Sequence, residues 1–249
     1  MRKIIASDYD GTLARPHLGV TDIDREAIRA WRAAGNLFGI VTGRGRMEEE
    51  LARVDVEYDF TIVFNGTEIY DGQGALTLSR MGDGKVLYDA LPIMLQKEGD
   101  WVDIVGKERS YYVTYQDKLV EERASWVKQE EIRNVPGFRQ IYALRHNDAE
   151  TLEIAAQLQE KFGDKMSPLV NGSWLNIAPP GVTKASGVLA YAKIMGVDEK
   201  NIFTIGDSYN DLDMVRRFGG FSVLNGAPEL KAVASQVVDG IQELVRLKM

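Results

Sequence analysis

Short apolar runs alternate with amphipathic segments over the first 80 residues of the chain. Thr21 stands three residues before an acid, and apolar positions then recur at helical spacing until Gly35. This spacing predicts a helix capped by Thr21, and the apolar runs have the length of buried strands. Strands that alternate with helices favour a parallel sheet with helices on both faces. The predicted strands are residues 3–7, 37–41 and 61–64, and the predicted helices are residues 23–34 and 47–54.

The pattern changes between residues 83 and 180, where predicted strands follow one another more often than they alternate with helices. Such a mixture favours an α+β unit with an antiparallel sheet. The predicted helices of this region are residues 86–96, 119–129 and 149–161. The predicted strands are residues 101–105, 111–115, 138–145, 165–170 and 174–178.

From residue 181 onwards the alternation of helix and strand returns. The predicted helices are residues 183–195, 212–218, 228–234 and 241–247, and the predicted strands are residues 201–205, 221–224 and 237–238. We therefore expect an α/β fold with a doubly wound, Rossmann-like parallel sheet. Residues 1–82 and 181–249 would form this core domain, and residues 83–180 would form an inserted α+β domain.

Composition places the chain among ordinary globular proteins. It has 249 residues, of which 45% are hydrophobic and 27% charged, and no apolar run approaches the roughly 18 residues of a membrane span. The net charge of −7 lacks the basic footprint of a nucleic-acid binder. The chain has no cysteine, and its two histidines, His17 and His146, lie far apart, which argues against a zinc site. With no signal peptide evident, we expect a cytoplasmic protein without nucleic-acid or membrane partners.

Two carboxylates follow the first predicted strand. Asp8 and Asp10 are two residues apart, so both side chains point the same way from an extended chain. They stand at the carboxyl end of the strand, where open α/β sheets bind ligands. Two close acids repel each other unless a cation or a proton joins them. Gly11 allows a tight turn that presents backbone N–H groups, which suits phosphate.

A second acidic loop covers residues 206–211, after a predicted strand and before a predicted helix. It supplies the carboxylates of Asp207 and Asp211 and the amide of Asn210. Hard oxygen ligands without histidine or cysteine suit Mg²⁺, which is the cofactor that we expect. The candidate metal ligands are Asp8, Asp10, Asp207 and Asp211.

Two further motifs lie at element boundaries. Thr42, Gly43 and Arg44 end a predicted strand, and a hydroxyl with free amides at a helix N-terminus forms a phosphate seat. Lys184 begins a helix, where a cation is unfavourable unless an anion is close. Each motif alone also allows a plainer interpretation: an Asp-Gly turn, a helix cap, an ion pair of Arg44 or a solvated Lys184. Their order along one sheet is more informative than any single motif.

The series Asp-x-Asp-x-Thr, Thr-Gly-Arg, Lys and Gly-Asp-x-x-Asn-Asp resembles the haloacid dehalogenase (HAD) superfamily across essentially the whole chain. The insertion between the second and third motifs resembles the Cof-type branch, subclass IIB, with a C2 cap. The resemblance implies that Asp8 is the nucleophile, which forms an aspartyl-phosphate, and that Asp10 is the general acid/base.

The resemblance also implies the binding roles. Thr42 and Lys184 would hold the phosphoryl oxygens, Asn210 would contact phosphate, and Asn65 would lie near the site. Asp8, Asp207 and the backbone carbonyl of Asp10 would bind Mg²⁺. Asp211 would support them.

We therefore expect a Mg²⁺-dependent phosphatase of small phosphorylated metabolites, with sugar phosphates favoured. A phosphomutase that uses the same intermediate is the alternative. A phospho-receiver module is less favoured, because receivers carry their phosphorylated Asp on a later strand and lack a large insertion. A non-catalytic binding protein is equally disfavoured, because it would need no intact constellation of motifs.

The sequence leaves the substrate and the oligomeric state open. The cap is expected to cover the cleft and to supply specificity, with Arg145, Asn171, Ser173 and Trp174 as candidate substrate contacts in addition to Asn65. The chain departs from its relatives after Lys184, where Ala185 stands in place of the usual glycine. The late loop 222–227 also matches the family only loosely.

Overall fold

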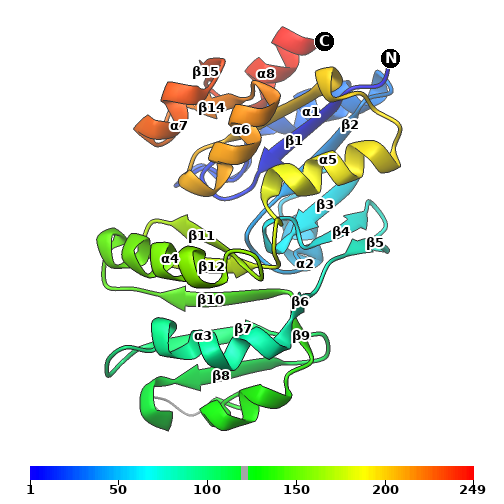
Figure 1. The fold of residues 1–249 in the computed structure, drawn as a ribbon. Helices are drawn as coiled ribbons and strands as arrows, with labels where there is room; N and C mark the ends of the chain where they lie inside the picture. The colour runs from blue at the N-terminus through cyan, green and yellow to red at the C-terminus, as the bar shows by residue number, and fades with distance from the viewer. Residues whose placement is uncertain (119–122) are drawn as a thin grey trace. The chain divides into compact units, whose positions relative to one another are not determined.

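The computed structural model describes residues 1–118 and 123–249, and the chain divides into two compact units. The first unit combines Met1–Ser79 with Thr183–Met249, and the second is Arg80–Val182 (Figure 1). The chain thus leaves the first unit once and returns to it. None of the helices in the described part of the chain combines the length and the apolar character that a membrane span requires.

An eight-stranded sheet forms the centre of the first unit, in the order β15-β14-β13-β1-β2-β3-β4-β5. The strands from β15 to β3 pair in parallel. Before the insertion the chain moves from β1 to one side, and after the insertion it continues on the other side with β13. In doubly wound sheets ligands bind at this switch point. The strands are β1 (Ile4–Asp8), β2 (Leu37–Val41), β3 (Phe60–Val63), β4 (Glu68–Asp71), β5 (Leu76–Ser79), β13 (Ile202–Gly206), β14 (Phe221–Val223) and β15 (Gln236–Val238).

Helices cover both faces of this sheet. Ile5 of β1 packs in one cluster with Trp31, whereas Ile4 packs in another cluster with Val188. Successive strand residues point to opposite faces, so the fully buried β1 requires a core on each side. One face carries α1 (Asp22–Ala33), α2 (Glu48–Arg53) and α8 (Ile241–Lys248), and the other carries α5 (Lys184–Ile194), α6 (Leu212–Phe218) and α7 (Pro228–Val233).

The second unit contains a five-stranded antiparallel sheet in the order β11-β12-β10-β7-β8. Only alternate residues of β7 are buried, which indicates a core on one face. Val102 of β7 packs there with Leu91 and Leu158, which come from the first and the second α-helix of this unit. The elements are β6 (Gly82–Asp83), α3 (Leu87–Met94), β7 (Trp101–Val105), β8 (Ser110–Thr114), β9 (Gly137–Phe138), β10 (Gln140–Leu144), α4 (Asp148–Phe162), β11 (Ser167–Asn171) and β12 (Trp174–Ala178).

The structure confirms the predicted doubly wound α/β core with an inserted α+β unit, but some individual elements differ from the prediction. β4 and β5 form an antiparallel hairpin that the sequence analysis does not include. The predicted helix 119–129 is wrong over residues 123–128, and its residues 119–122 lie outside the described part of the chain. Trp126 forms a bridge with Tyr112 of β8, so packing along this strand overrides the helical tendency of the segment.

Candidate active site

Asp8 and Asp207 stand at the carboxyl ends of neighbouring strands. β1 ends at Asp8, and β13 ends at Gly206, directly before Asp207. The loop after β1 packs closely on this pair, because a Cβ on Gly11 would overlap the Asp207 carboxylate. Gly11 also has a φ of 83°, which glycine adopts without strain. The turn that brings the two acids together therefore requires glycine at this position.

Lys184 joins two carboxylates in the interior. It is the first residue of α5, whose N-cap Thr183 accepts a hydrogen bond from the backbone N–H of Ser186. Its Nζ donates to Asp8 Oδ1 at 2.6 Å and to Asp211 Oδ1 at 2.7 Å, and only 1% of Lys184 is exposed. The two anions offset the unfavourable interaction of a cation with the helix N-terminus.

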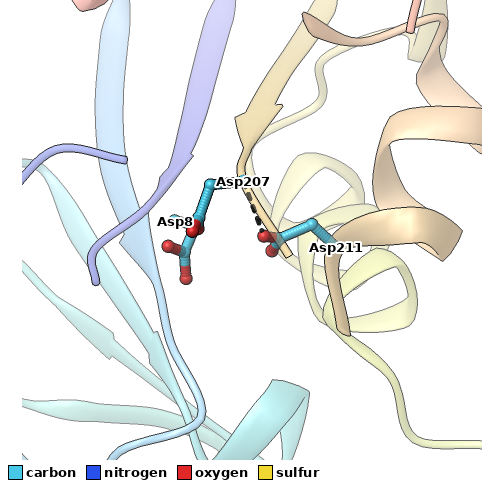
Figure 2. A group of neighbouring side chains, drawn as sticks. All are labelled: Asp8, Asp207 and Asp211. Atoms are coloured by element: carbon cyan, nitrogen blue, oxygen red, sulfur yellow. Dashed lines mark hydrogen bonds between the residues drawn. The ribbon is translucent and has the colours of Figure 1, made fainter. Parts of the chain in front are cut away.

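Asp211 shapes the loop that carries Asp207. Its buried carboxylate accepts hydrogen bonds at Oδ2 from the backbone N–H groups of Asp207 (3.0 Å) and Ser208 (3.1 Å), the first of which is drawn in Figure 2. Thr12 Oγ1 donates to Asp207 Oδ1 at 3.0 Å. Asp207 is therefore held at its backbone by Asp211 and at its carboxylate by Thr12.

Three acids share this site with the Lys184 cation. Carboxylate oxygens of Asp8, Asp207 and Asp211 lie within 4.8 Å of one another (Figure 2). Burial raises the pKa of Asp8 well above its ordinary value, against the opposing effect of Lys184 and with the help of the two other acids. Burial, together with the nearby Asp211, also raises the pKa of Asp207 to about 6. Burial and the neighbouring acids favour the neutral form of both groups, and a further cation beside them would favour the ionised form.

The donor set fits a hard divalent cation. Among the residues that the structure describes, none donates a hydrogen bond to the buried Oδ2 of Asp8. A buried oxygen without a partner is costly, and a cation beside it would remove that cost. The ligand atoms of the group are all carboxylate oxygens, which Mg²⁺ and Ca²⁺ prefer.

The predicted phosphate seat lies at the same edge of the sheet. Asp8 pairs in register with Val41, the residue before Thr42. The buried Thr42 accepts a hydrogen bond at Oγ1 from the backbone N–H of Arg44, at 3.1 Å. A Cβ on Gly43 would lie 3.1 Å from Asn65 Nδ2, so the buried Asn65 side chain lies against this loop.

The Asn65 side chain also reaches the second acidic loop. Asn210 Nδ2 donates to Asn65 Oδ1 at 3.5 Å. The structure therefore gathers Thr42, Gly43, Asn65 and Asn210 around the edge that carries Asp8.

The carboxylate of Asp10 lies outside the group of three acids. It accepts a hydrogen bond at Oδ2 from Arg44 Nε at 2.8 Å, and Arg44 also donates to Asp10 Oδ1. The same guanidinium donates to Glu50, and about half of the Asp10 side chain is exposed. Arg44 is thus an ion-pair partner, as one interpretation of its motif expected.

The remaining candidate residues belong to the second unit. Arg145 is buried and donates to Asp100 Oδ1 at 3.1 Å and to the backbone carbonyl of Met94 at 2.6 Å. These contacts assign Arg145 to the core of this unit rather than to a substrate.

The other three cap candidates lie on one hairpin. Asn171 pairs with Trp174 across β11 and β12, and Ser173 donates to Asp148 at 2.9 Å in the turn between them. The Trp174 side chain is 43% exposed and packs edge-on against Trp101. Trp174 therefore offers an accessible ring, while the Ser173 hydroxyl already has a partner.

Two residues of the site escape the sequence analysis. Thr12 orients Asp207 and stands in the Asp-x-Asp-x-Thr motif, so its position was a usable signal. Asn225 Nδ2 donates to the backbone carbonyl of Gly11 at 2.9 Å, across 214 positions of sequence. No local pattern indicates a contact of that range.

Known proteins resemble this chain over nearly its whole length. The family model described as haloacid dehalogenase-like hydrolase matches residues 5–243. The 5-amino-6-(5-phospho-D-ribitylamino)uracil phosphatase YcsE of Bacillus subtilis (strain 168) is 27% identical, with 95% of this chain and 90% of that protein covered. The pyridoxal phosphate phosphatase YbhA of Escherichia coli (strain K12) is 24% identical, with 95% and 93% covered. The solved structure of the HAD subclass IIB sugar phosphatase BT4131 superposes with a TM-score of 0.80 at 20% identity, over 98% of each chain, which shows a shared fold.

Proposed function

Because the chain belongs to the haloacid dehalogenase-like hydrolases, we propose that it is a Mg²⁺-dependent phosphatase of small phosphorylated metabolites, sugar phosphates above all. The observation that carries the proposal is the buried Lys184, which joins Asp8 to Asp211 beside Asp207. A carboxylate that attacks a phosphate dianion meets electrostatic repulsion, and a fixed cation beside the nucleophile offsets it. The names of YcsE and YbhA, which specify phosphorylated small molecules, support the substrate class.

The acidic group would hold the metal. Asp8, Asp207 and the backbone carbonyl of Asp10 would bind Mg²⁺, while Asp211 keeps the Asp207 loop in place through its two backbone contacts. When bound, Mg²⁺ supplies positive charge that offsets the repulsion between the carboxylates and the phosphate.

The chemistry proceeds in two transfers. Asp8 attacks phosphorus, the bond from phosphorus to the leaving oxygen breaks, and Asp10 donates its proton to that oxygen. The Asp10 carboxylate then takes a proton from the water that attacks the aspartyl-phosphate, which releases phosphate and restores Asp8. Since the Asp10 carboxylate is ion-paired with Arg44 in the structure, its side chain has to leave this ion pair before the first proton transfer.

Binding of the phosphoryl group falls to the edge around Asp8. Lys184 and the Thr42 hydroxyl would hold phosphoryl oxygens, with the Gly43 backbone and the Asn210 amide completing the seat. The expected phosphate contact of Gly11 is not favoured, because its N–H donates to the Ala14 carbonyl at 3.0 Å. The inserted domain, residues 83–180, would act as a cap that selects the leaving group. Asn171 and the exposed ring of Trp174 are the contacts that we favour there.

Release of inorganic phosphate from a panel of phosphorylated metabolites tests the proposal. We expect turnover with Mg²⁺, loss in EDTA, recovery when Mg²⁺ is restored, and poor support by Ca²⁺, which prefers longer bonds and higher coordination numbers. Asp8→Asn should lose activity by at least about 10³-fold, because an amide cannot attack phosphorus. Asp22→Asn is the matched control, since that side chain is 92% exposed on α1.

Full turnover by protein shown to be metal-free would contradict the role of Mg²⁺. If no substrate of the panel releases phosphate, the proposed phosphatase activity is refuted. Transfer of the phosphoryl group to a second position of the substrate, in place of its release to water, would favour the phosphomutase.

A further inference from the structure

The loop after β3 has an unusual backbone. We call residues Phe64, Asn65 and Gly66 the β3 loop. Phe64 and Asn65 have φ angles of 51° and 54°, and Gly66 has a φ of 112°. The left-handed region is rare for a residue other than glycine, and two such residues in succession, one of them a bulky aromatic, persist only where surrounding contacts hold them.

Contacts with the phosphate seat account for this conformation. The backbone N–H of Asn65 donates to the Thr42 carbonyl at 2.9 Å, and the backbone N–H of Phe64 donates to the Arg44 carbonyl at 2.7 Å. The side chains make a second set of contacts. A Cβ on Gly43 would lie 3.1 Å from Asn65 Nδ2, and a Cβ on Gly45 would lie 3.0 Å from the Phe64 ring. The β3 loop therefore contacts residues 42–45 in two ways: its backbone N–H groups bind the carbonyls of Thr42 and Arg44, and its side chains lie against the α-carbons of Gly43 and Gly45.

The same loop contacts the two other segments of the site. A Cβ on Gly187 of α5 would lie 3.0 Å from the Gly66 α-carbon, one helical turn after Lys184. Asn210, from the second acidic loop, donates to Asn65 Oδ1 at 3.5 Å. These contacts lie within the first unit, and Asn65 has no exposed surface at all. Asn65 is thus placed between the phosphate seat and the Asn210 loop, with no surface of its own for a substrate.

We propose that Asn65 is a positioning residue, which keeps the Thr42–Gly43 seat in register with Lys184 and Asn210 rather than contacting the substrate. The role rests on the proposed phosphatase function. The side-chain amide acts as a spacer: its oxygen accepts a hydrogen bond from Asn210, and a Cβ on Gly43 would lie 3.1 Å from its nitrogen and 3.2 Å from its oxygen. The left-handed backbone places the Asn65 N–H on the Thr42 carbonyl. Loss of the spacer loosens residues 42–45, which weakens the binding of the phosphoryl group in both substrate and product.

Two variants and one control separate this role from a direct contact. Asn65→Gly keeps the left-handed backbone without strain but removes the spacer. Asn65→Asp keeps the shape, the tolerance of positive φ and the acceptor for Asn210. Asp55→Gly is the matched control, because Asp55 also has a positive φ, 49°, within the same unit, and its side chain is 80% exposed.

The first measurement is hydrogen exchange of peptides that cover residues 42–45 and 64–66, in metal-free buffer. We expect exchange to become about tenfold faster or more in Asn65→Gly and to stay near the wild-type rate in Asp55→Gly. Asn65→Asp should fall between the two, because its carboxylate keeps the shape of the spacer but adds a buried charge. Unchanged protection in Asn65→Gly would overturn the proposal, since a residue that only contacts substrate leaves the loop as it was.

The second measurement uses p-nitrophenyl phosphate as substrate and inorganic phosphate as inhibitor, with Mg²⁺ present. In Asn65→Gly, KM and the inhibition constant of phosphate should rise together, on the order of tenfold, because substrate and product share the seat. A loss confined to kcat, with phosphate inhibition unchanged, would also overturn the proposal. If the wild type hydrolyses no phosphate ester, the proposed function fails, while the exchange experiment still decides whether Asn65 holds the seat.

Discussion

Replacing Lys184 by methionine removes the cation that joins Asp8 to Asp211 and keeps a chain of similar length. Both hydrogen bonds of Nζ disappear, so Oδ1 of each acid loses a charged donor in the interior. The Oδ2 atom of Asp8 is already buried without a hydrogen bond. In the absence of metal, the variant would therefore bury the Asp8 carboxylate without the Lys184 hydrogen bond to Oδ1 and with no hydrogen bond to Oδ2.

The expected cost is large for a single substitution. Breaking a buried ion pair by removing one partner typically costs about 3–5 kcal/mol, against a total stability of about 5–15 kcal/mol for a natural domain. Acids can escape part of this cost by taking up a proton. The pKa of Asp8 is already raised by burial, and losing Lys184 raises it further. The destabilisation should therefore be greatest near pH 8 and shrink towards pH 5.

Urea unfolding in EDTA measures this effect. The two units can unfold separately, so hydrogen exchange of peptides from β1 and β13 is the probe that reports on the first unit. Lys193→Met is the matched control, because it makes the same chemical change on an exposed residue of α5. Adding Mg²⁺ should restore part of the lost stability, since a bound ion stabilises the folded state by mass action.

Two results would refute the reasoning. One is a destabilisation at pH 8 below about 1 kcal/mol, the level of an exposed ion pair. The other is a destabilisation that does not depend on pH, which would indicate lost packing rather than lost charge.

Two further outcomes follow from the acidic residues. Asp10→Asn should retain much of the first transfer with p-nitrophenyl phosphate, whose leaving group needs little proton assistance, and should stall at hydrolysis of the aspartyl-phosphate. With p-nitrophenyl phosphate we expect a burst of about one equivalent of nitrophenolate per active site, and with a sugar phosphate we expect no burst of product. Equal loss of activity with both substrates, without any phosphoprotein that can be trapped, would refute the role of Asp10 as general acid/base. The pKa of Asp207 is raised to about 6 in the folded state, so the unfolded chain ionises first and the metal-free fold loses stability as pH rises from about 4 to about 6. Asp207→Asn should therefore be more stable than the wild type in EDTA at pH 7, by up to about 3 kcal/mol, with the difference gone at pH 4 in thermal unfolding; a variant that is less stable at pH 7 would contradict the shift.

Much of the fold follows from the sequence because buried strands and capped helices leave local patterns. Residues 37–41 form β2 as predicted, and Thr21 caps α1 by accepting a hydrogen bond from the Asp24 N–H. The β4–β5 hairpin also carries a signal, since Asp71, Gly72 and Gly74 mark its turn. The segment 123–128 does not, because its conformation depends on a strand partner elsewhere in the chain.

The acidic group was predictable for a similar reason. Parallel neighbouring strands end at one edge, so acids that follow β1 and β13 must meet there. The partners of Asp10 and Arg145 were not predictable, because a charged side chain can pair with any residue that the fold brings near. Arg145 finds Asp100 at a distance of 45 positions, and burial then fixes a role that composition cannot reveal.

The insertion has a consequence for biosynthesis. Thr12 and Asp207, which hydrogen-bond across the centre of the first unit, are separated by 195 positions. At a synthesis rate of about 5–20 residues per second, β1 waits roughly 10–40 seconds for its neighbour β13. During that interval one edge of a strand that is wholly buried in the finished fold is unpaired, and unpaired edges recruit other chains. The inserted unit is synthesised and able to fold within the same period, so delays in its folding would lengthen the exposure of β1. Substitutions in the insertion could therefore lower the yield of active enzyme through aggregation of the nascent core, without altering any residue of that core.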